Sequence, residues 1–249
     1  MVTKIEWVVN GDGTQGETLN PLGFWCFGPT GTRENPAPCP YCYAKIMAKR
    51  GMTKCELCKT FTTPHTHFEQ LEKLKKWKKP RTIFMQSMGD LLHDEVPDEW
   101  IEEVFKACEG ASHHTFLFLS KNPKRYIELS SGSKLPYNHW YGTTAIDDYD
   151  DVLCSGIHNT FVSCEPIHGE IDIRLFNGGH PKSKQNLIIV GMETGNRRGK
   201  TIPKREWIEN IVEDCNETDI PVFLKNNLIG VCEEDYVKRH QHVPWRDAI

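Results

Sequence analysis

The chain has 249 residues, ten cysteines and a formal net charge of -4. This length suffices for one large domain or two small ones with a sizeable core, and the slight acidity gives no global electrostatic case for nucleic-acid binding. The N-terminus has no apolar signal region and no apolar run approaches membrane-spanning length, so we expect a cytoplasmic protein without membrane partners. In a reducing cytoplasm, cysteines serve as ligands, nucleophiles or core residues more often than as disulfides.

Short apolar strands alternate with amphipathic helices along the chain. The expected strands are 4–9, 82–86, 115–119, 139–145, 160–164, 187–191 and 221–224. Several are continuous apolar runs, which are typical of parallel strands buried on both faces. Segments 97–110 and 203–217 keep apolar residues at helical spacing after a proline, which predicts two helices. The alternation predicts an α/β fold with parallel strands.

Polar residues follow most of the expected strands at the point where each strand ends. The residues at these points, polar except for Met88 and Gly89, are Ser87, Met88, Gly89 and Asp90, then Ser120 and Lys121, Thr143 and Thr144, Ser163 and Glu165, Glu193 and Thr194, and Lys225 and Asn226. The carboxyl ends of parallel strands meet at one edge, where barrels and open α/β sheets build their sites. We therefore expect a functional site at this edge.

Two sets of cysteine ligands compete. In the first, Cys39, Cys42, Cys55 and Cys58 form a C-x2-C-x12-C-x2-C pattern, which is close to the spacing of a zinc ribbon. In the second, Cys26, Cys39 and Cys42 hold three irons of a [4Fe–4S] cluster and leave the fourth iron open for a substrate or cofactor. Spacing alone favours the zinc ribbon.

Sequence context favours the cluster. Cys26 follows the first expected strand, and the three cysteines share one long loop at the carboxyl edge, facing the polar strand ends. A zinc ribbon would be a separate attachment to the α/β fold, and it would give no reason for the polar residues at the strand ends. If the three cysteines hold a cluster, Cys55 and Cys58 form either a second metal site or no site. In a second site, zinc is the candidate ion, and His65 or His67 would complete the ligands.

The run EKLKKWKKPR (72–81) is the most basic stretch and contains Trp77. A charge run is usually a solvated face, but an aromatic among basic residues also suits nucleic-acid contact. Both readings stay open.

The element Cys39-Pro40-Tyr41-Cys42 resembles the second half of the radical S-adenosylmethionine signature, in which two residues separate the last two cysteines. The first cysteine usually lies three residues earlier, whereas here the twelve residues FGPTGTRENPAP separate Cys26 from Cys39. The whole chain also resembles an uncharacterised, often phage-encoded branch of this superfamily. The motifs that carry this resemblance are IEW, NP before the first cysteine, CYAKIMAKR, LKKWKKPRTIFMQSMGDLLHDEVPDEWI, HTFLFLSKNPKRY, FVSCEPI, VGMETG and PVFLKNN.

The resemblance implies a partial (β/α) TIM-type barrel of about six parallel strands, with the cluster loop at its C-terminal mouth. It implies a single domain over residues 1–249 with a cysteine-rich insertion at about 26–67. The implied activity is reductive cleavage of S-adenosylmethionine by the [4Fe–4S] cluster, giving methionine and a 5′-deoxyadenosyl radical that abstracts hydrogen from an unidentified substrate. The alternative function is a zinc-ribbon module that binds nucleic acid or protein without catalysis.

The resemblance also suggests which residues contact S-adenosylmethionine. Tyr41 is placed near the adenine, and Ser87, Met88, Gly89 and Asp90 occupy the position of the Gly-Gly-Glu stretch that holds the methionine amine. Candidates for ribose and carboxylate contacts are Ser120, Lys121, Thr143, Ser163 and Glu165. Candidates for adenine or substrate contacts are Glu193, Thr194 and Lys225.

The implied partners are S-adenosylmethionine and an electron donor such as flavodoxin or ferredoxin. A phage-encoded member would work in the host cytoplasm. The phage association of that branch suggests, by analogy alone, a nucleotide or nucleic-acid substrate.

Overall fold

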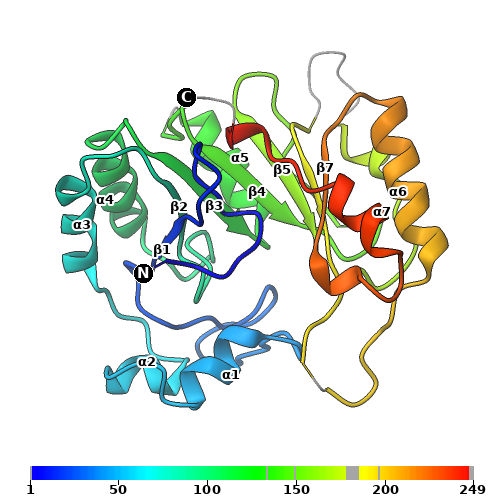
Figure 1. The fold of residues 1–249 in the computed structure, drawn as a ribbon. Helices are drawn as coiled ribbons and strands as arrows, with labels where there is room; N and C mark the ends of the chain where they lie inside the picture. Colours follow the sequence, from blue (N-terminus) through cyan, green and yellow to red (C-terminus); the bar gives the residue numbers. More distant parts are fainter. Residues whose placement is uncertain (1, 133, 149, 178–184, 196, 247–249) are drawn as a thin grey trace. The chain divides into compact units, whose positions relative to one another are not determined.

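The structure is a computed structural model that describes residues 2–132, 134–148, 150–177, 185–195 and 197–246. The chain forms two compact units, whose helices and strands are drawn in Figure 1. Unit 1 consists of residues 1–3 and 16–136, and unit 2 of residues 4–15 and 137–249. Each unit is an α/β structure with its own parallel strands.

Unit 1 contains three strands and five α-helices. They are β1 (Glu17–Leu19), α1 (Tyr43–Lys49), α2 (Glu56–Thr60), α3 (Glu72–Lys76), β2 (Thr82–Met85), α4 (Asp98–Glu109), β3 (Thr115–Ser120) and α5 (Pro123–Ser131). Strand β2 lies between β1 and β3 and pairs in parallel with both, so that Phe84 is opposite Thr18 on one side and Leu117 on the other.

The described residues of unit 2 form four strands and two α-helices. They are β4 (Trp140–Thr144), β5 (Asn159–Cys164), β6 (Ile188–Val190), α6 (Arg205–Glu217), β7 (Val222–Leu224) and α7 (Glu234–Arg239). The strands pair in parallel in chain order, with Val162 of β5 opposite Ile188 of β6 and Ile188 opposite Val222 of β7. All carboxyl ends in this unit therefore lie at one edge.

The two expected helices are confirmed. Helix α4 begins after Pro97 and buries Ile101, Val104, Phe105 and Cys108. Helix α6 buries Ile208, Ile211, Val212 and Cys215, and its apolar face packs into the same core as the inner residues of β5, β6 and β7. The thiols of Cys108 and Cys215 thus serve packing, as does that of Cys164.

The expected strand at 4–9 is wrong. This segment forms a turn in unit 2, in which the Val8 N–H donates to the Ile5 carbonyl at 3.0 Å. Trp7 and Val8 are buried, so the run is apolar because it enters the core and not because it joins the ladder. The Gln15 side chain donates to the carbonyls of Ile5 and Val8, which satisfies backbone groups that a strand would have paired.

The first strand of the chain is instead β1, whose Glu17 is buried and ion-paired with Arg81 at 2.6 Å. The other six expected strands are present within one or two residues of their expected bounds. The structure has seven parallel strands, three in unit 1 and four in unit 2, where we expect about six. The α/β class is confirmed, and among the described residues no helix is long and apolar enough to cross a membrane.

Trp7 should be essential to the stability of unit 2. Its ring lies 5.8 Å from that of Phe161 and 6.3 Å from that of Trp245, and it is almost fully buried. Trp7→Ala should lower the free energy of unfolding by about 3–5 kcal/mol because it leaves a large cavity. Urea unfolding measures this, with Ile157→Ala, at 66% exposure, as the control. Equal losses in the two variants would contradict the packing role.

Candidate functional site

The group formed by Cys55, Cys58, His65 and His67 could hold a metal ion. The four possible ligand atoms all lie within 4.8 Å of one another in unit 1. Cys58 Sγ lies 3.1 Å from His65 Nε2 and 3.5 Å from His67 Nε2, and Cys55 Sγ lies 3.7 Å from His65 Nε2. The expected second site thus uses both histidines, where the sequence left His65 and His67 as alternatives.

Each histidine of this Cys2His2 group is oriented by its other ring nitrogen. His65 Nδ1 is 2.7 Å from the carbonyl oxygen of Thr63, and His67 Nδ1 is 2.9 Å from the Glu69 carboxylate. Metal-binding histidines in proteins usually have such partners, which fix the ring and its tautomer.

The two thiols of the group differ in their environment. The backbone N–H of Cys58 lowers the pKa of the Cys55 thiol, whereas burial raises the pKa of the Cys58 thiol against the effect of the Phe24 N–H. Hydrogen bonds to a thiolate favour its ionised form, and ionised sulfur is the metal ligand.

Cys26, Cys39 and Cys42 approach one another elsewhere in unit 1. Cys26 and Cys42 pack against the same apolar cluster of Ala44, Ala48, Phe61 and Met88. Cys26 Sγ accepts the Gly28 N–H at 3.3 Å, and Cys42 Sγ accepts the Lys45 N–H at 3.4 Å at the start of α1. The Cys42 N–H donates to the Cys39 carbonyl at 3.0 Å, which closes a turn between these two cysteines.

The three thiols also interact electrostatically. Burial, the nearby Asp90 carboxylate and the thiols of Cys42 and Cys39 raise the pKa of Cys26 to about 12. Burial and then Cys39 raise the pKa of Cys42, despite the Lys45 N–H. Three thiolates would repel one another in this partly buried place, and a bound cation would remove that repulsion.

The structure separates the two ligand sets that the sequence left open. Cys55 and Cys58 group with two histidines, and among the described residues, which include all ten cysteines, Cys39 and Cys42 are outside that group. The four-thiolate set with zinc-ribbon spacing is therefore not the arrangement of this structure. Cys39 and Cys42 interact with Cys26 instead.

Asp90 joins the ends of β2 and β3. Its Oδ1 accepts hydrogen bonds from Ser120 Oγ at 2.7 Å and the Leu92 N–H at 3.0 Å, and its Oδ2 accepts the Lys121 N–H at 2.9 Å. Three expected site residues, Asp90, Ser120 and Lys121, are thus brought together. The sequence presented them as ligand contacts, and the structure adds a role in fixing the edge of the sheet.

The glycine before Asp90 is explained by backbone packing. A Cβ on Gly89 would lie 2.5 Å from the carbonyl oxygen of Trp25, one residue before Cys26. Met88 is buried in the apolar cluster that Cys26 and Cys42 also contact. Lys121 Nζ lies 5.8 Å from the centre of the Tyr41 ring, so the residue between Cys39 and Cys42 faces the end of β3.

Asn20 and Gln86 position the site and were missed from the sequence. Asn20 Oδ1 accepts the Met88 N–H at 2.8 Å and Ser87 Oγ at 3.3 Å. Gln86 has a left-handed backbone with φ of 61°, and its side chain bonds the Leu22 N–H and the Gly23 carbonyl. Asn20 belongs to the NP motif and Gln86 is the last residue of an expected strand. Their places in these motifs were the only features of the sequence that could have indicated a role at the site.

Unit 2 brings Ser163, Glu165 and Lys225 together at the ends of β5 and β7. Lys225 Nζ forms an ion pair with Glu165, whose other oxygen accepts Ser163 Oγ at 3.1 Å. Burial opposes the Lys225 charge, but Glu165 and then Glu6 raise the pKa of Lys225 above its ordinary value. Gly191, which directly follows β6, makes room for the pair, since a Cβ there would lie 2.7 Å from Glu165 Oε1.

The remaining expected residues of unit 2 have other partners. Glu193 is buried and forms a bidentate ion pair with Arg197, with both contacts at 2.7 Å, and this pair lowers the pKa of Glu193. Thr143 is buried, and its hydroxyl accepts the Leu153 N–H at 3.1 Å. Glu6 of the IEW motif accepts the Asn226 N–H at 2.7 Å, a contact that the sequence did not suggest.

A family model matches residues 2–243, and its description is Protein of unknown function (DUF5131). The chain belongs to the DUF5131 family. No curated protein and no solved structure matches it.

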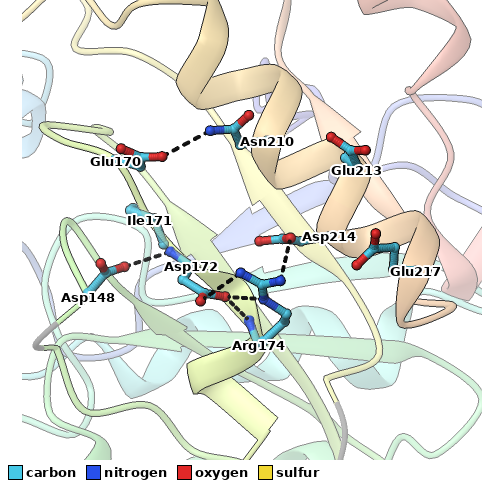
Figure 2. A pocket seen from close by; sticks show the side chains of 9 residues that line it. All are labelled: Asp148, Glu170, Ile171, Asp172, Arg174, Asn210, Glu213, Asp214 and Glu217. Carbon is cyan, nitrogen blue, oxygen red and sulfur yellow. Dashed lines mark hydrogen bonds and ion pairs between the residues drawn. The ribbon is translucent and has the colours of Figure 1, made fainter.

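The DUF5131 chain has an acidic pocket in unit 2, shown in Figure 2, with a volume of about 380 Å³. Its one cation, Arg174, contacts Asp172 at 2.7 Å and Asp214 at 3.6 Å. None of the residues selected from the sequence lines this pocket. Arg174 pairs with two of the carboxylates, the Asp172 N–H donates to Asp148, and the Asn210 side chain donates to Glu170. The carboxylates of Glu213 and Glu217 are exposed. We therefore assign no function to this pocket.

The basic run 72–81 of the DUF5131 chain lies at the amino end of β2. It contains α3 and ends with Arg81, whose guanidinium is 4.9 Å from the centre of the Trp77 ring. The site residues Ser87–Asp90 follow the carboxyl end of the same strand. Nucleic acid bound to this run would therefore contact the edge of unit 1 that is opposite to Ser87–Asp90.

Asp90→Asn should destabilise the DUF5131 chain even without any ligand. An amide in place of the carboxylate cannot accept from Ser120, Leu92 and Lys121 together, and a lost charge-assisted hydrogen bond costs about 1–3 kcal/mol. Urea unfolding of the metal-free protein measures this. Asp94→Asn, an exposed carboxylate bonded to the Asn122 side chain, is the matched control. Unchanged stability in Asp90→Asn would contradict the proposed anchoring.

The ion pair between Glu165 and Lys225 should show energetic coupling. Each side chain is only 18% exposed, so Glu165→Gln should leave a poorly solvated ammonium and cost up to about 3–5 kcal/mol of stability. The double variant Glu165→Gln/Lys225→Met should lose less than the sum of its single variants, which a double-mutant cycle measures. Additive losses would show that the contact has no net coupling.

Proposed function

We propose that this protein is a radical S-adenosylmethionine enzyme that holds a [4Fe–4S] cluster on Cys26, Cys39 and Cys42. The observation that supports the proposal is that Cys26 and Cys42 pack against one apolar cluster, that Cys39 is joined to Cys42 by a backbone hydrogen bond, and that all three are outside the Cys2His2 group. Three thiolates are the number that leaves one iron of such a cluster open. Membership of DUF5131 neither favours nor opposes this function.

The donor set fits the cluster chemically. The three sulfurs are partly buried, Cys26 and Cys42 pack on one apolar cluster, and backbone N–H groups point at both. Hydrogen bonds to sulfur and low solvent exposure are the means by which a protein tunes a cluster. When bound, the cluster would supply the electron that cleaves S-adenosylmethionine.

The chain's own residues would bind and orient the cofactor. Asp90 Oδ2 accepts one hydrogen bond, so the carboxylate keeps acceptor capacity for the methionine amine while it anchors β3. Lys121, whose N–H donates to Asp90, is a candidate for ribose contacts, and Tyr41, whose ring faces Lys121 Nζ, is a candidate for adenine contacts. In unit 2, the candidates for further contacts are Thr143, Ser163, Glu165, Glu193 and Lys225.

The proposal includes the partial barrel, an external electron donor such as flavodoxin or ferredoxin, and a nucleotide or nucleic-acid substrate. The parallel order of strands within each unit supports the barrel. The substrate class rests on analogy alone.

In this proposal the Cys2His2 group holds zinc, as a structural ion separate from the cluster. Two thiolates and two imidazoles are a common zinc ligand set, and zinc prefers four ligands in tetrahedral geometry. The same observation supports the alternative function, a zinc-containing module that binds nucleic acid or protein without catalysis. The two functions differ in their iron content.

Anaerobic reconstitution with iron and sulfide should give a brown protein with about four irons per chain. Cys26→Ala, Cys39→Ala and Cys42→Ala should each lose this complement, because a missing thiolate leaves the cluster incompletely ligated. Iron and sulfide counts, visible absorbance and electron paramagnetic resonance measure the loss, and Cys154→Ala in unit 2 is the control. The reconstituted, reduced wild type should convert S-adenosylmethionine to methionine and 5′-deoxyadenosine.

Two results would overturn the proposal. A colourless wild type with zinc and no iron would favour the binding module. A full cluster in Cys26→Ala would show that this cysteine is not a ligand.

A further inference from the structure

We propose that a zinc ion bound by the Cys2His2 group fixes the backbone of residues 21–26, the segment that carries Cys26. We call this role of the ion the clamp. The inference rests on the proposed function only in treating Cys26 as a cluster ligand. The metal site and the clamp are argued from unit 1 alone.

The orientation of the histidine rings favours a cation between the four ligands. The Thr63 carbonyl and the Glu69 carboxylate accept hydrogen bonds from His65 Nδ1 and His67 Nδ1, so each ring is held by that nitrogen. The Nε2 atoms of both rings face the sulfur atoms of the group. Two ring nitrogens and two sulfurs that converge in this way are a common ligand set for zinc.

The distances agree with tetrahedral zinc. Bonds of about 2.3 Å to sulfur and about 2.0–2.1 Å to nitrogen place neighbouring sulfur and nitrogen ligands about 3.5 Å apart. Three of the four sulfur–nitrogen distances in the group are 3.1, 3.5 and 3.7 Å. Small adjustments of side chains would therefore suffice for binding.

The segment around the metal ligands contacts residues 21–26 along most of their length. The His67 N–H donates to the Pro21 carbonyl at 2.6 Å, and the Phe24 N–H faces the Cys58 thiol. Phe61 forms a parallel bridge with Trp25 and accepts the Cys26 N–H at 3.2 Å. Fixing the four ligands on one ion would thus fix the backbone that presents Cys26.

Gly23 shows how closely this segment approaches the metal site. A Cβ at Gly23 would lie 2.4 Å from His65 Nε2, the ligand atom itself, and the residue has φ of +68°. The imidazole therefore occupies the space that any other side chain at this position would need. The Gln86 side chain also holds this turn, because its Nε2 donates to the Gly23 carbonyl at 2.7 Å.

The first test is metal content, measured on the full chain purified without cluster reconstitution. The wild type should contain about one zinc per chain, and Cys58→Ala should contain none. Cobalt(II) in place of zinc should give the visible ligand-field bands of a tetrahedral thiolate site. Glu69→Gln should weaken zinc binding by about tenfold or more through the orientation of His67. Cys154→Ala should retain zinc.

The second test is the reactivity of Cys26 toward an alkylating reagent, followed by peptide mass spectrometry. Removing zinc from the wild type with a chelator should speed alkylation of Cys26, because its backbone is released. Cys108, fully buried in α4 of the same unit, should stay unreactive and reports any global unfolding. Adding zinc back should slow the reaction of Cys26 again.

Gly23→Ala and Gly51→Ala provide a matched pair of variants. Both glycines have left-handed backbones, with φ of +68° and +73°, so both substitutions carry similar backbone strain. Only Gly23→Ala places a Cβ against His65, whereas the space around Gly51 is open. Gly23→Ala should therefore lose zinc and expose Cys26, and Gly51→Ala should do neither.

Several outcomes would overturn the inference. An absence of zinc in the wild type, or iron in its place, would remove the zinc site. Zinc without any effect on Cys26 alkylation would remove the clamp, as would parallel rises for Cys26 and Cys108. Because neither test uses the cluster, a failure of iron loading alone would refute the proposed function and leave the clamp intact.

Discussion

Two thiols and two imidazoles converge at one point of unit 1, and the organisation of the surrounding loops depends on that convergence. Because Cys55 and Cys58 group with the two histidines, they do not share a site with Cys39 and Cys42. It also ties residues 55–67 to residues 21–26, because the backbone on both sides of the ligands bonds to that segment. The loop that carries Cys26 has these backbone contacts without forming a regular helix or strand.

The polar residues at the strand ends mainly bond to one another. Asp90 satisfies Ser120 and Lys121 in unit 1, and Glu165 pairs with Lys225 in unit 2. Poorly solvated polar groups require such partners, so their presence at an edge is no proof of ligand contact.

The motifs that suggested a family resemblance prove to contact one another within each unit. In unit 1, Asn20 of the NP motif binds Ser87 and Met88. In unit 2, Trp7 of the IEW motif packs on Phe161, and Glu6 binds the backbone of Asn226. These pairs are far apart in sequence, so each motif is constrained by a partner elsewhere in its unit. The presence of all these motifs in one chain therefore has a structural reason, which is independent of the reaction that the protein performs.

The sequence by itself determined the parallel α/β class, six of the seven strands, the two long helices and the candidate cysteines. Apolar runs and helical spacing depend on local burial, which is a property of each segment. Only the tertiary structure decided that residues 4–9 form a buried turn, because an apolar run enters a core equally well as a strand or a turn. It alone also showed that both His65 and His67 group with Cys55 and Cys58. Ligand spacing was compatible with two sets, and the choice depended on His65 and His67 folding back over Cys58, with Gly23 leaving room for the imidazole.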